Sequence, residues 1–288
     1  MSDGYVKKLL DPAKRRAVLR TLPIMTGDLR KNVLQAKQVA LPLGAHFDYL
    51  HVARADRISY FDIRPEDWPS DHLKLFIEDT LVSTQFQSGR NAKTLRPLFY
   101  LPYQRNNTAR MKLEEPGTYN GPGVRFFTTA MIDGCSVYIE GPAGTPKVTH
   151  ANAQSVQPTS VHDNWVTKQN KIQAKIQHMD ANYAHLHKAA AAVVERPDYI
   201  ADDPVELLRV KTAFANAHGV PANRVSSYQP FGAVLGFKDG NSWSFWLQKN
   251  GTFNYRKRTT DPRDSVKYWV IEAREVWPNG GGHFRLIP

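Results

Sequence analysis

The chain has 288 residues, and 41% of them are hydrophobic, which is ordinary for a globular protein of one large or two small domains. Its net charge of +11 favours acidic partners, and its single cysteine excludes an internal disulfide. No run of about 18 apolar residues predicts a membrane span, and no apolar stretch near residue 1 predicts an ordinary secretory signal. The sequence has no metal-binding, phosphate-loop or dinucleotide motif, so neither a metal nor a cofactor is predicted.

The N-terminal segment is basic: residues 1–40 contain nine Lys or Arg and three Asp. An Asp-Pro pair caps a predicted helix over 13–19, and a second helix is predicted over 28–40. We expect residues 1–45 to form a basic helical arm that binds a membrane, an acidic protein or a chaperone, or else a helical cap on the main domain. Residues 46–288 are then a single catalytic domain.

The next part of the chain changes between strand, helix and loop signals. Aromatic and β-branched residues predict a strand hairpin, and a serine before an apolar helical repeat predicts a capped helix. The expected elements are paired strands over 46–53 and 57–63, a helix over 71–86 capped by Ser70, a strand over 97–103, a loop-rich stretch over 105–123, and strands over 124–132 and 136–139.

The second half begins with the strongest helical pattern. A long apolar stripe predicts a helix that starts at a capping box of Ser160 and Asp163 and ends before Pro197. An Asp-Pro pair and a terminal glycine bound a further helix over 203–218. Asn250–Gly251 is typical of a type I′ turn and predicts a hairpin. The expected strands are 231–237, 242–248, 252–256 and 266–275, with a last short strand after the glycines at 280–282.

Strands and helices come in blocks, without the regular alternation of a parallel α/β protein. This order predicts an α+β fold: a central β-sandwich of mixed or antiparallel strands, with helices packed outside. No internal repeat points to a different architecture.

The candidate chemistry centres on Cys135, the only cysteine, and on His150, fifteen residues later. A strand, a turn and a returning strand between them bring the two side chains within reach of each other. A free thiol has a pKa of about 8.5, so it needs a base to become a nucleophile, and a histidine supplies one. Gly134 leaves the approach to the sulfur open, and a backbone N–H, for example that of Cys135, can hold an oxyanion.

A third group usually fixes the imidazole of such a pair. Thr129, six residues before the cysteine, and Asn152, two residues after the histidine, are the candidates. The carboxylate of Asp133 disfavours the thiolate form of Cys135, because an adjacent negative charge raises the pKa of a thiol. A buried, structural Cys135 is the alternative, since free cysteines are among the most buried residues.

The segment 128–153 resembles the catalytic core of the bacterial glutamine-deamidating toxins: the cytotoxic necrotizing factors, the Bordetella dermonecrotic toxin, the Burkholderia lethal factor and, more distantly, the chemoreceptor glutamine deamidases. Their shared motif is Leu-Ser-Gly-Cys followed by a histidine. This chain has Ile-Asp-Gly-Cys, ending at Cys135, and His150 at the spacing of the necrotizing factors. Thr129 matches a threonine that completes the site in some members, whereas Asp133 departs from the serine of the motif.

The resemblance implies a cysteine-dependent deamidase that converts a glutamine of a host protein to glutamate through a thioester. Cys135 is then the nucleophile, His150 the base and Thr129 the orienter, and no cofactor takes part. Some members use an amine in place of water and act as transglutaminases. The resemblance also implies a β-sandwich, secretion or injection by a bacterium, and action in the host cytoplasm on a small GTPase or a translation factor.

Three alternative functions fit the same sequence. A Cys–His pair also serves cysteine peptidases and acyltransferases. The basic N-terminal segment and the basic run 256–258, which follows two aromatic residues, fit a nucleic-acid-binding module in which Cys135 is structural. The long helix is a candidate interaction surface of an adaptor protein.

Overall fold

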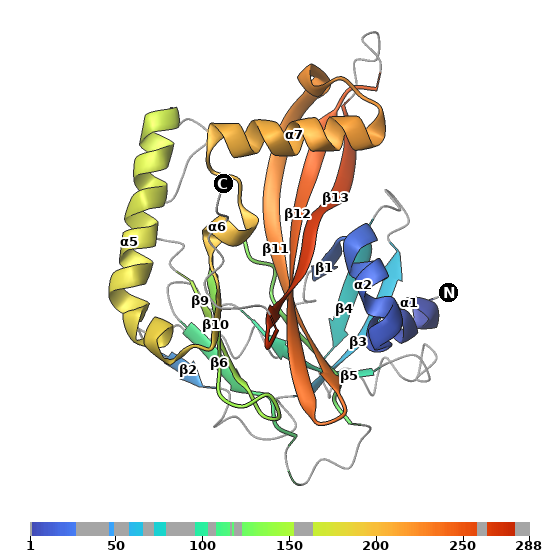
Figure 1. Cartoon of the computed structure of the whole chain (residues 1–288), viewed down its shortest axis with the longest axis vertical. Helices are drawn as coiled ribbons and strands as arrows, with labels where there is room; N and C mark the ends of the chain where they lie inside the picture. The colour runs from blue at the N-terminus through green and yellow to red at the C-terminus, as the bar shows by residue number, and fades with distance from the viewer. Residues whose placement is uncertain are drawn as a thin grey trace.

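The computed structural model describes residues 2–26, 46–48, 58–65, 72–78, 96–102, 108–115, 117, 123–152, 164–257 and 264–279. Within these ranges, two β-sheets pack against each other and helices lie outside them (Figure 1). The predicted α+β sandwich is therefore confirmed. None of the helices in these ranges is long and apolar enough to cross a membrane.

Among the described residues, the larger sheet has eight strands, in the spatial order β1 (Ile24–Thr26), β4 (Leu73–Glu78), β3 (Ile58–Pro65), β5 (Arg96–Leu101), β7 (Phe126–Thr129), β11 (Val225–Asp239), β12 (Ser242–Tyr255) and β13 (Ser265–Trp277). β1 is parallel to β4 and β5 is parallel to β7, whereas the other neighbours are antiparallel. The last three strands are 13 to 15 residues long and extend beyond the rest of the sheet (Figure 1).

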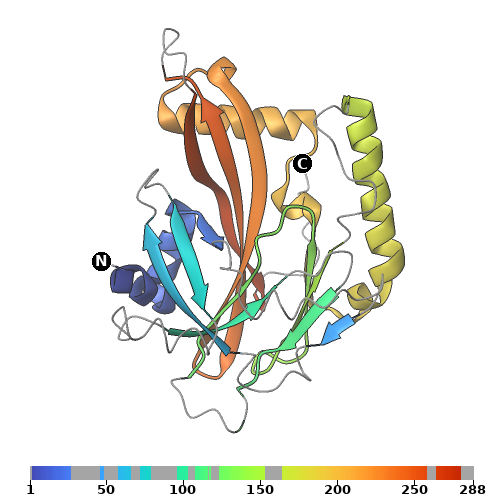
Figure 2. The same ribbon diagram turned by 180° about the vertical axis from the view of Figure 1, so that it is seen from behind.

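The described part of the smaller sheet has five strands, in the order β10 (Ala192–Val194), β8 (Ser136–Glu140), β9 (Lys147–Ala151), β6 (Thr108–Lys112) and β2 (His46–Asp48). It lies between the larger sheet and the helix α5 (Trp165–Ala189), as the view from behind also shows (Figure 2). Because side chains alternate along a strand, its two faces have different neighbours. Val137, Ile139 and Val148 join the core shared with the larger sheet, whereas Tyr138 and Ala151 pack against α5.

The other helices cover the larger sheet. They are α1 (Ser2–Leu10), α2 (Pro12–Thr21), α6 (Arg196–Tyr199), α7 (Pro204–His218) and the short 3₁₀ helix η2 (Ala222–Arg224). α7 crosses the far ends of β11, β12 and β13, and α1 and α2 lie on the side opposite α5 (Figure 1). The caps predicted for α2 and α7 are present, because Asp11 and Asp203 accept from backbone N–H groups and Gly219 ends α7 at φ 63°.

The described part of the N-terminal segment shares the main core. Leu9 and Leu19 are buried in the cluster that both sheets form. Gln248 of β12 accepts a hydrogen bond from the backbone of Ile24 at 2.7 Å and donates to the carbonyl of Leu19 at 2.7 Å. Residues 2–21 therefore form a helical cap, one of the two expected arrangements, and residues 24–26 add the edge strand β1 to the larger sheet. The helix predicted over 28–40 lies outside the described residues.

Three predictions for the first half are wrong, and the first is the loop-rich stretch over 105–123, which contains the strand β6. Leu73, Leu75 and Ile77 belong to a strand and not to the predicted helix over 71–86, because the backbone of β4 pairs with β1 and β3 and these alternate side chains point into the core. Residues 79–86 lie outside the described residues. The hairpin predicted from residues 46–63 is also wrong. β2 pairs with β6 in the smaller sheet, whereas β3 pairs with β4 and β5 in the larger one.

Three further predictions fail in the second half. The long helix α5 ends at Ala189 and not just before Pro197, and residues 192–194 form the strand β10 instead. Asn250 and Gly251 lie inside β12, and the chain turns at Gly240 instead. Rings of Tyr228 and Phe253 occupy the place where a Cβ of residue 251 would be, so packing explains this glycine. The helix α5 begins at Trp165, and its N-cap is Asn164, whose side chain accepts from a backbone N–H, and not the predicted Ser160.

Candidate active site

Cys135 directly follows a turn that passes from one sheet to the other. Ile132 exchanges two backbone hydrogen bonds with Gly232 of the larger sheet, at 2.9 and 2.8 Å, and the strand after the cysteine belongs to the smaller sheet. Gly134 makes the crossing at φ 145°, a backbone conformation that favours glycine. The Tyr199 hydroxyl donates to the Cys135 carbonyl at 2.7 Å and holds the turn in place.

The ladder between β8 and β9 decides which side chains meet. Val137 pairs with His150 in antiparallel register. The ladder ends at Ser136 and Ala151, and one residue beyond it the side chains of Cys135 and Asn152 meet through a hydrogen bond. Both are on the same face as His150 because alternate residues share a face. Diagonal neighbours across such a pair are about 7–8 Å apart, within reach of side chains. The predicted strand, turn and returning strand are therefore present.

The sulfur lies in a closed environment, since Cys135 is only 2% exposed. Asn152 Nδ2 donates to Sγ at 2.8 Å. Burial, together with the Asp133 carboxylate, raises the pKa of the thiol to about 11, whereas the Lys175 ammonium and the Asn152 amide act in the opposite direction. The effect of Asp133 has the sign expected from its position in the sequence. Asn152 was expected to orient the imidazole, and its side-chain amide donates a hydrogen bond to the sulfur.

His150 is completely buried. Burial lowers the pKa of the imidazole to about 4, and the carbonyls of Leu101 and Pro102, which face the ring from the end of β5, favour its protonated form. Neither ring nitrogen has a hydrogen-bond partner of good geometry among the described residues. The imidazole is therefore neutral at pH 7 and has a nitrogen available for a proton.

Thr129 lies at the end of β7, buried beside Leu101, its partner in a parallel ladder. Its hydroxyl donates to the carbonyl of Ala130 at 2.7 Å. Leu101 connects it to His150, because the Leu101 carbonyl faces the imidazole. The predicted role of Thr129 as an orienter stays a prediction, and in this geometry backbone carbonyls are the groups that face the ring.

The two pKa values set the resting protonation state of the pair. With the thiol at about 11 and the imidazole at about 4, the proton stays on Cys135 at neutral pH and His150 stays neutral. Moving the proton costs on the order of 10 kcal/mol, before the attraction between the resulting ions is counted. Groups that favour a negative charge on the sulfur therefore decide whether the pair can react.

Three side chains near Cys135 and its turn were not predicted from the sequence. Tyr199 and Arg196 come from α6 and Lys175 from the middle of α5, so none of them belongs to a local motif around the cysteine. One signal points to Lys175. It lies three residues after Ile172 and four before Met179, on the buried stripe of the helix, where an apolar residue is expected.

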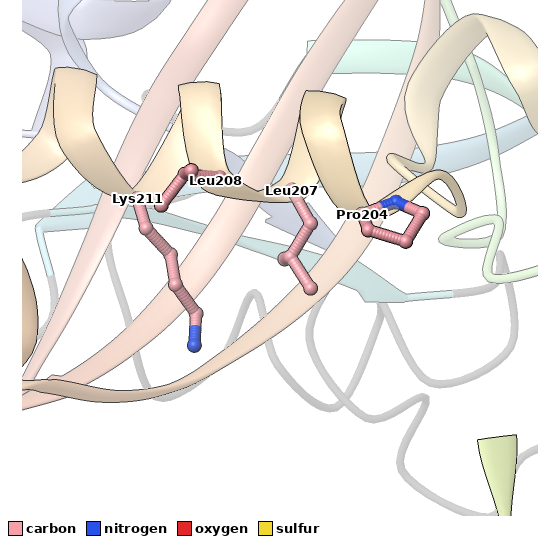
Figure 3. A pocket seen from close by; sticks show the side chains of 4 residues that line it. All are labelled: Pro204, Leu207, Leu208 and Lys211. Carbon is pink, nitrogen blue, oxygen red and sulfur yellow. The ribbon is translucent and has the colours of Figure 1, made fainter.

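A separate groove of about 460 Å³ lies along α7, lined by Pro204, Leu207, Leu208 and Lys211 (Figure 3). The groove is open to solvent and mostly apolar, and its lining contains neither a cysteine nor a histidine. None of the predicted site residues lines it, so this groove is not the place of the candidate chemistry.

Within the described ranges, no three His, Cys, Asp or Glu side chains converge where a metal ion could bind. No protein-family model and no curated protein matches the chain. The arrangement of Cys135, His150 and their neighbours is therefore the basis for assigning a function.

Proposed function

We propose that the protein is a cysteine-dependent protein-glutamine deamidase, a bacterial toxin or effector that is secreted or injected and acts in the host cytoplasm. The register of β8 and β9 carries the proposal, because it puts Cys135, His150 and Asn152 on one face of the smaller sheet. A thiol, a neutral imidazole and an amide that donates to the sulfur are groups that acyl transfer uses. Thr129, the Gly-Cys pair and His150 also carry the resemblance to the deamidating toxins.

In the proposed reaction, Cys135 Sγ attacks the side-chain carbonyl carbon of a glutamine while the thiol proton moves to His150. The C–N bond then breaks, and His150 returns the proton to the leaving nitrogen, which departs as ammonia. Water attacks the resulting thioester with His150 again as the base, and this step releases glutamate and the free thiol. Glutamine and water give glutamate and ammonia, so the reaction needs no cofactor and no oxidant.

Burial of the sulfur favours a side-chain amide as the substrate. Cys135 is 2% exposed, and its turn is fixed from both sides by Ile132 and Tyr199. A glutamine side chain is slender and flexible, so it needs a much smaller opening than a peptide main chain with side chains on either side. This difference supports deamidation over peptide cleavage by the same pair.

The net charge of the chain supports a substrate with an acidic surface. The partner in this proposal is a host protein that exposes the target glutamine. A small GTPase or a translation factor is the class of target that the resemblance implies.

The test is to incubate host-cell lysate with the full chain and search all proteins for glutamine-to-glutamate conversion by mass spectrometry, with ammonia release measured in parallel. We expect conversion at one or a few glutamines, and no conversion with Cys135→Ser or His150→Ala. Thr149→Val is the matched control, because Thr149 is the buried neighbour of His150 on the opposite face of β9. This variant should keep the activity.

Two other results would reject the proposal. Cleavage of host proteins that depends on Cys135 would assign the pair to a peptidase. Salt-dependent binding of arbitrary DNA or RNA that Cys135→Ser leaves intact, without any glutamine conversion, would assign the chain to the nucleic-acid-binding class.

A further inference from the structure

Lys175 occupies an unusual position for a helix lysine. It lies on the stripe of α5 whose other members, Ile172 and Met179, are buried, and it is itself half-buried. Its Nζ lies 2.8 Å from the point that a Cβ of Gly134 would occupy, beside the turn that carries Cys135. The ammonium group is therefore directed at the turn of the candidate nucleophile.

Two cations meet beside Gly134, and they differ in their pairing. Arg196 Nη1 lies 3.0 Å from the same point, but its guanidinium is bound by both carboxylate oxygens of Asp202, at 2.6 and 2.8 Å. Lys175 forms no hydrogen bond and no ion pair with a residue of the described ranges. Its positive charge is therefore available to act on Cys135.

Packing alone does not explain this lysine. Burial lowers the pKa of Lys175, because the ammonium group loses solvation, while the nearby Cys135 and Asp133 favour its charged form. A leucine at this position would fill the same stripe without removing a charge from water. An interaction with the turn therefore accounts for the lysine better than a role in the core.

We propose that Lys175 is a positioning residue of the active site, whose ammonium group stabilises the negative charge that forms on Cys135 and so makes the buried thiol a usable nucleophile. The catalytic consequence rests on the proposed deamidase function, whereas the effect on the thiol does not require a glutamine substrate. During ionisation the thiol proton goes to His150 and the electron pair stays on the sulfur. Lys175 remains protonated and transfers no proton.

Among the charged groups of the described residues, one can add to the stabilisation that the Asn152 hydrogen bond gives the sulfur. The titratable and charged groups that these residues bring near Cys135 are Asp133 from its own turn, His150 from β9, Lys175 from α5, and Arg196 and Tyr199 from α6. Asp133 opposes a negative charge on the sulfur, and His150 and Tyr199 are neutral at pH 7. The charge of Arg196 is balanced by its carboxylate partner, which leaves Lys175.

The test measures the rate at which iodoacetamide alkylates Cys135 in the full chain as a function of pH, with the single cysteine giving one product. Lys175→Met removes the charge and keeps an unbranched side chain. We expect the profile to move to higher pH by about one unit, and the rate at fixed pH below the midpoint to fall about tenfold. Lys175→Arg, which keeps the charge, should restore most of the rate.

Lys188→Met, on the exposed last turn of α5, is the matched control and should leave the profile unchanged. A Lys175→Met profile with the same midpoint and only a lower overall rate would overturn the proposal. Poorer access of iodoacetamide to the sulfur lowers the alkylation rate by the same factor at every pH and leaves the midpoint unchanged. If thermal melting shows that Lys175→Met does not fold, Lys175→Gln is compared in its place.

The two proposals fail in different ways. A shifted alkylation profile without glutamine conversion in any host protein supports the role of Lys175 and rejects the deamidase. An unshifted profile together with glutamine conversion rejects the role of Lys175 and supports the deamidase.

Discussion

Burial of His150 makes the folding stability of this protein depend on acid pH. In the folded chain the pKa of the imidazole is lowered from 6.5 to about 4. The folded state therefore binds this proton less tightly than the unfolded state. The stabilisation is fully present above pH 6.5 and is lost as the pH falls through 4. It corresponds to about 3 kcal/mol of unfolding free energy.

The perturbation is His150→Asn, which removes the titrating group and keeps a polar side chain. Urea unfolding, followed by tryptophan fluorescence, is compared at about pH 7 and about pH 4.5 for both proteins. Between these conditions we expect the wild type to lose about 2.5 kcal/mol more unfolding free energy than His150→Asn. Carboxylates that titrate in the same interval contribute to both proteins and cancel in the comparison.

His185→Asn, which replaces an exposed histidine of α5, is the matched control and should respond to acid like the wild type. Equal acid sensitivity of the wild type and His150→Asn would refute the reasoning. It would mean that the fold does not hold the imidazole neutral, and that His150 is not poised to accept the proton of Cys135.

Three further outcomes follow from the structure. Asp133→Asn should shift the alkylation profile of Cys135 to lower pH, because the carboxylate raises the thiol pKa, and an unmoved profile would contradict that cause. Gln248→Leu leaves buried backbone groups of the N-terminal segment without hydrogen-bond partners, so the free energy of unfolding in urea should fall by about 2–5 kcal/mol. An unchanged free energy of unfolding would mean that these hydrogen bonds do not stabilise the fold. Gly251→Ala places a methyl group against two aromatic rings and should cost about 1–3 kcal/mol in the same assay, whereas Gly117→Ala, with open space around it, should cost little.

Elements with strong local signals were predictable. Asp11 and Asp203 each precede a proline, and both cap helices as expected, because a side-chain oxygen bonds the free N–H groups of the first turn. The hairpin between Cys135 and His150 was also predictable, since two short strands separated by a glycine-containing turn form antiparallel pairs without help from distant residues.

Elements whose local signals conflict with distant partners were not predictable. Residues 73–78 carry apolar side chains that suit a helix or a strand, and pairing with β1 and β3 decides for the strand. Asn250–Gly251 has the composition of a hairpin turn. Strands β11 and β13 pair with it on both sides, and the ring of Tyr228 fills the space that the glycine leaves.

The sequence alone determined the α+β class and the spacing that puts a thiol and an imidazole on neighbouring strands, because these properties depend on residues close together in the chain. Only the tertiary structure decided the chemical state of the pair. Desolvation of Cys135 and His150, and the charge of Lys175 beside the turn, depend on which distant segments surround the site. Burial and electrostatic interactions act through space, so no local pattern of residues encodes them.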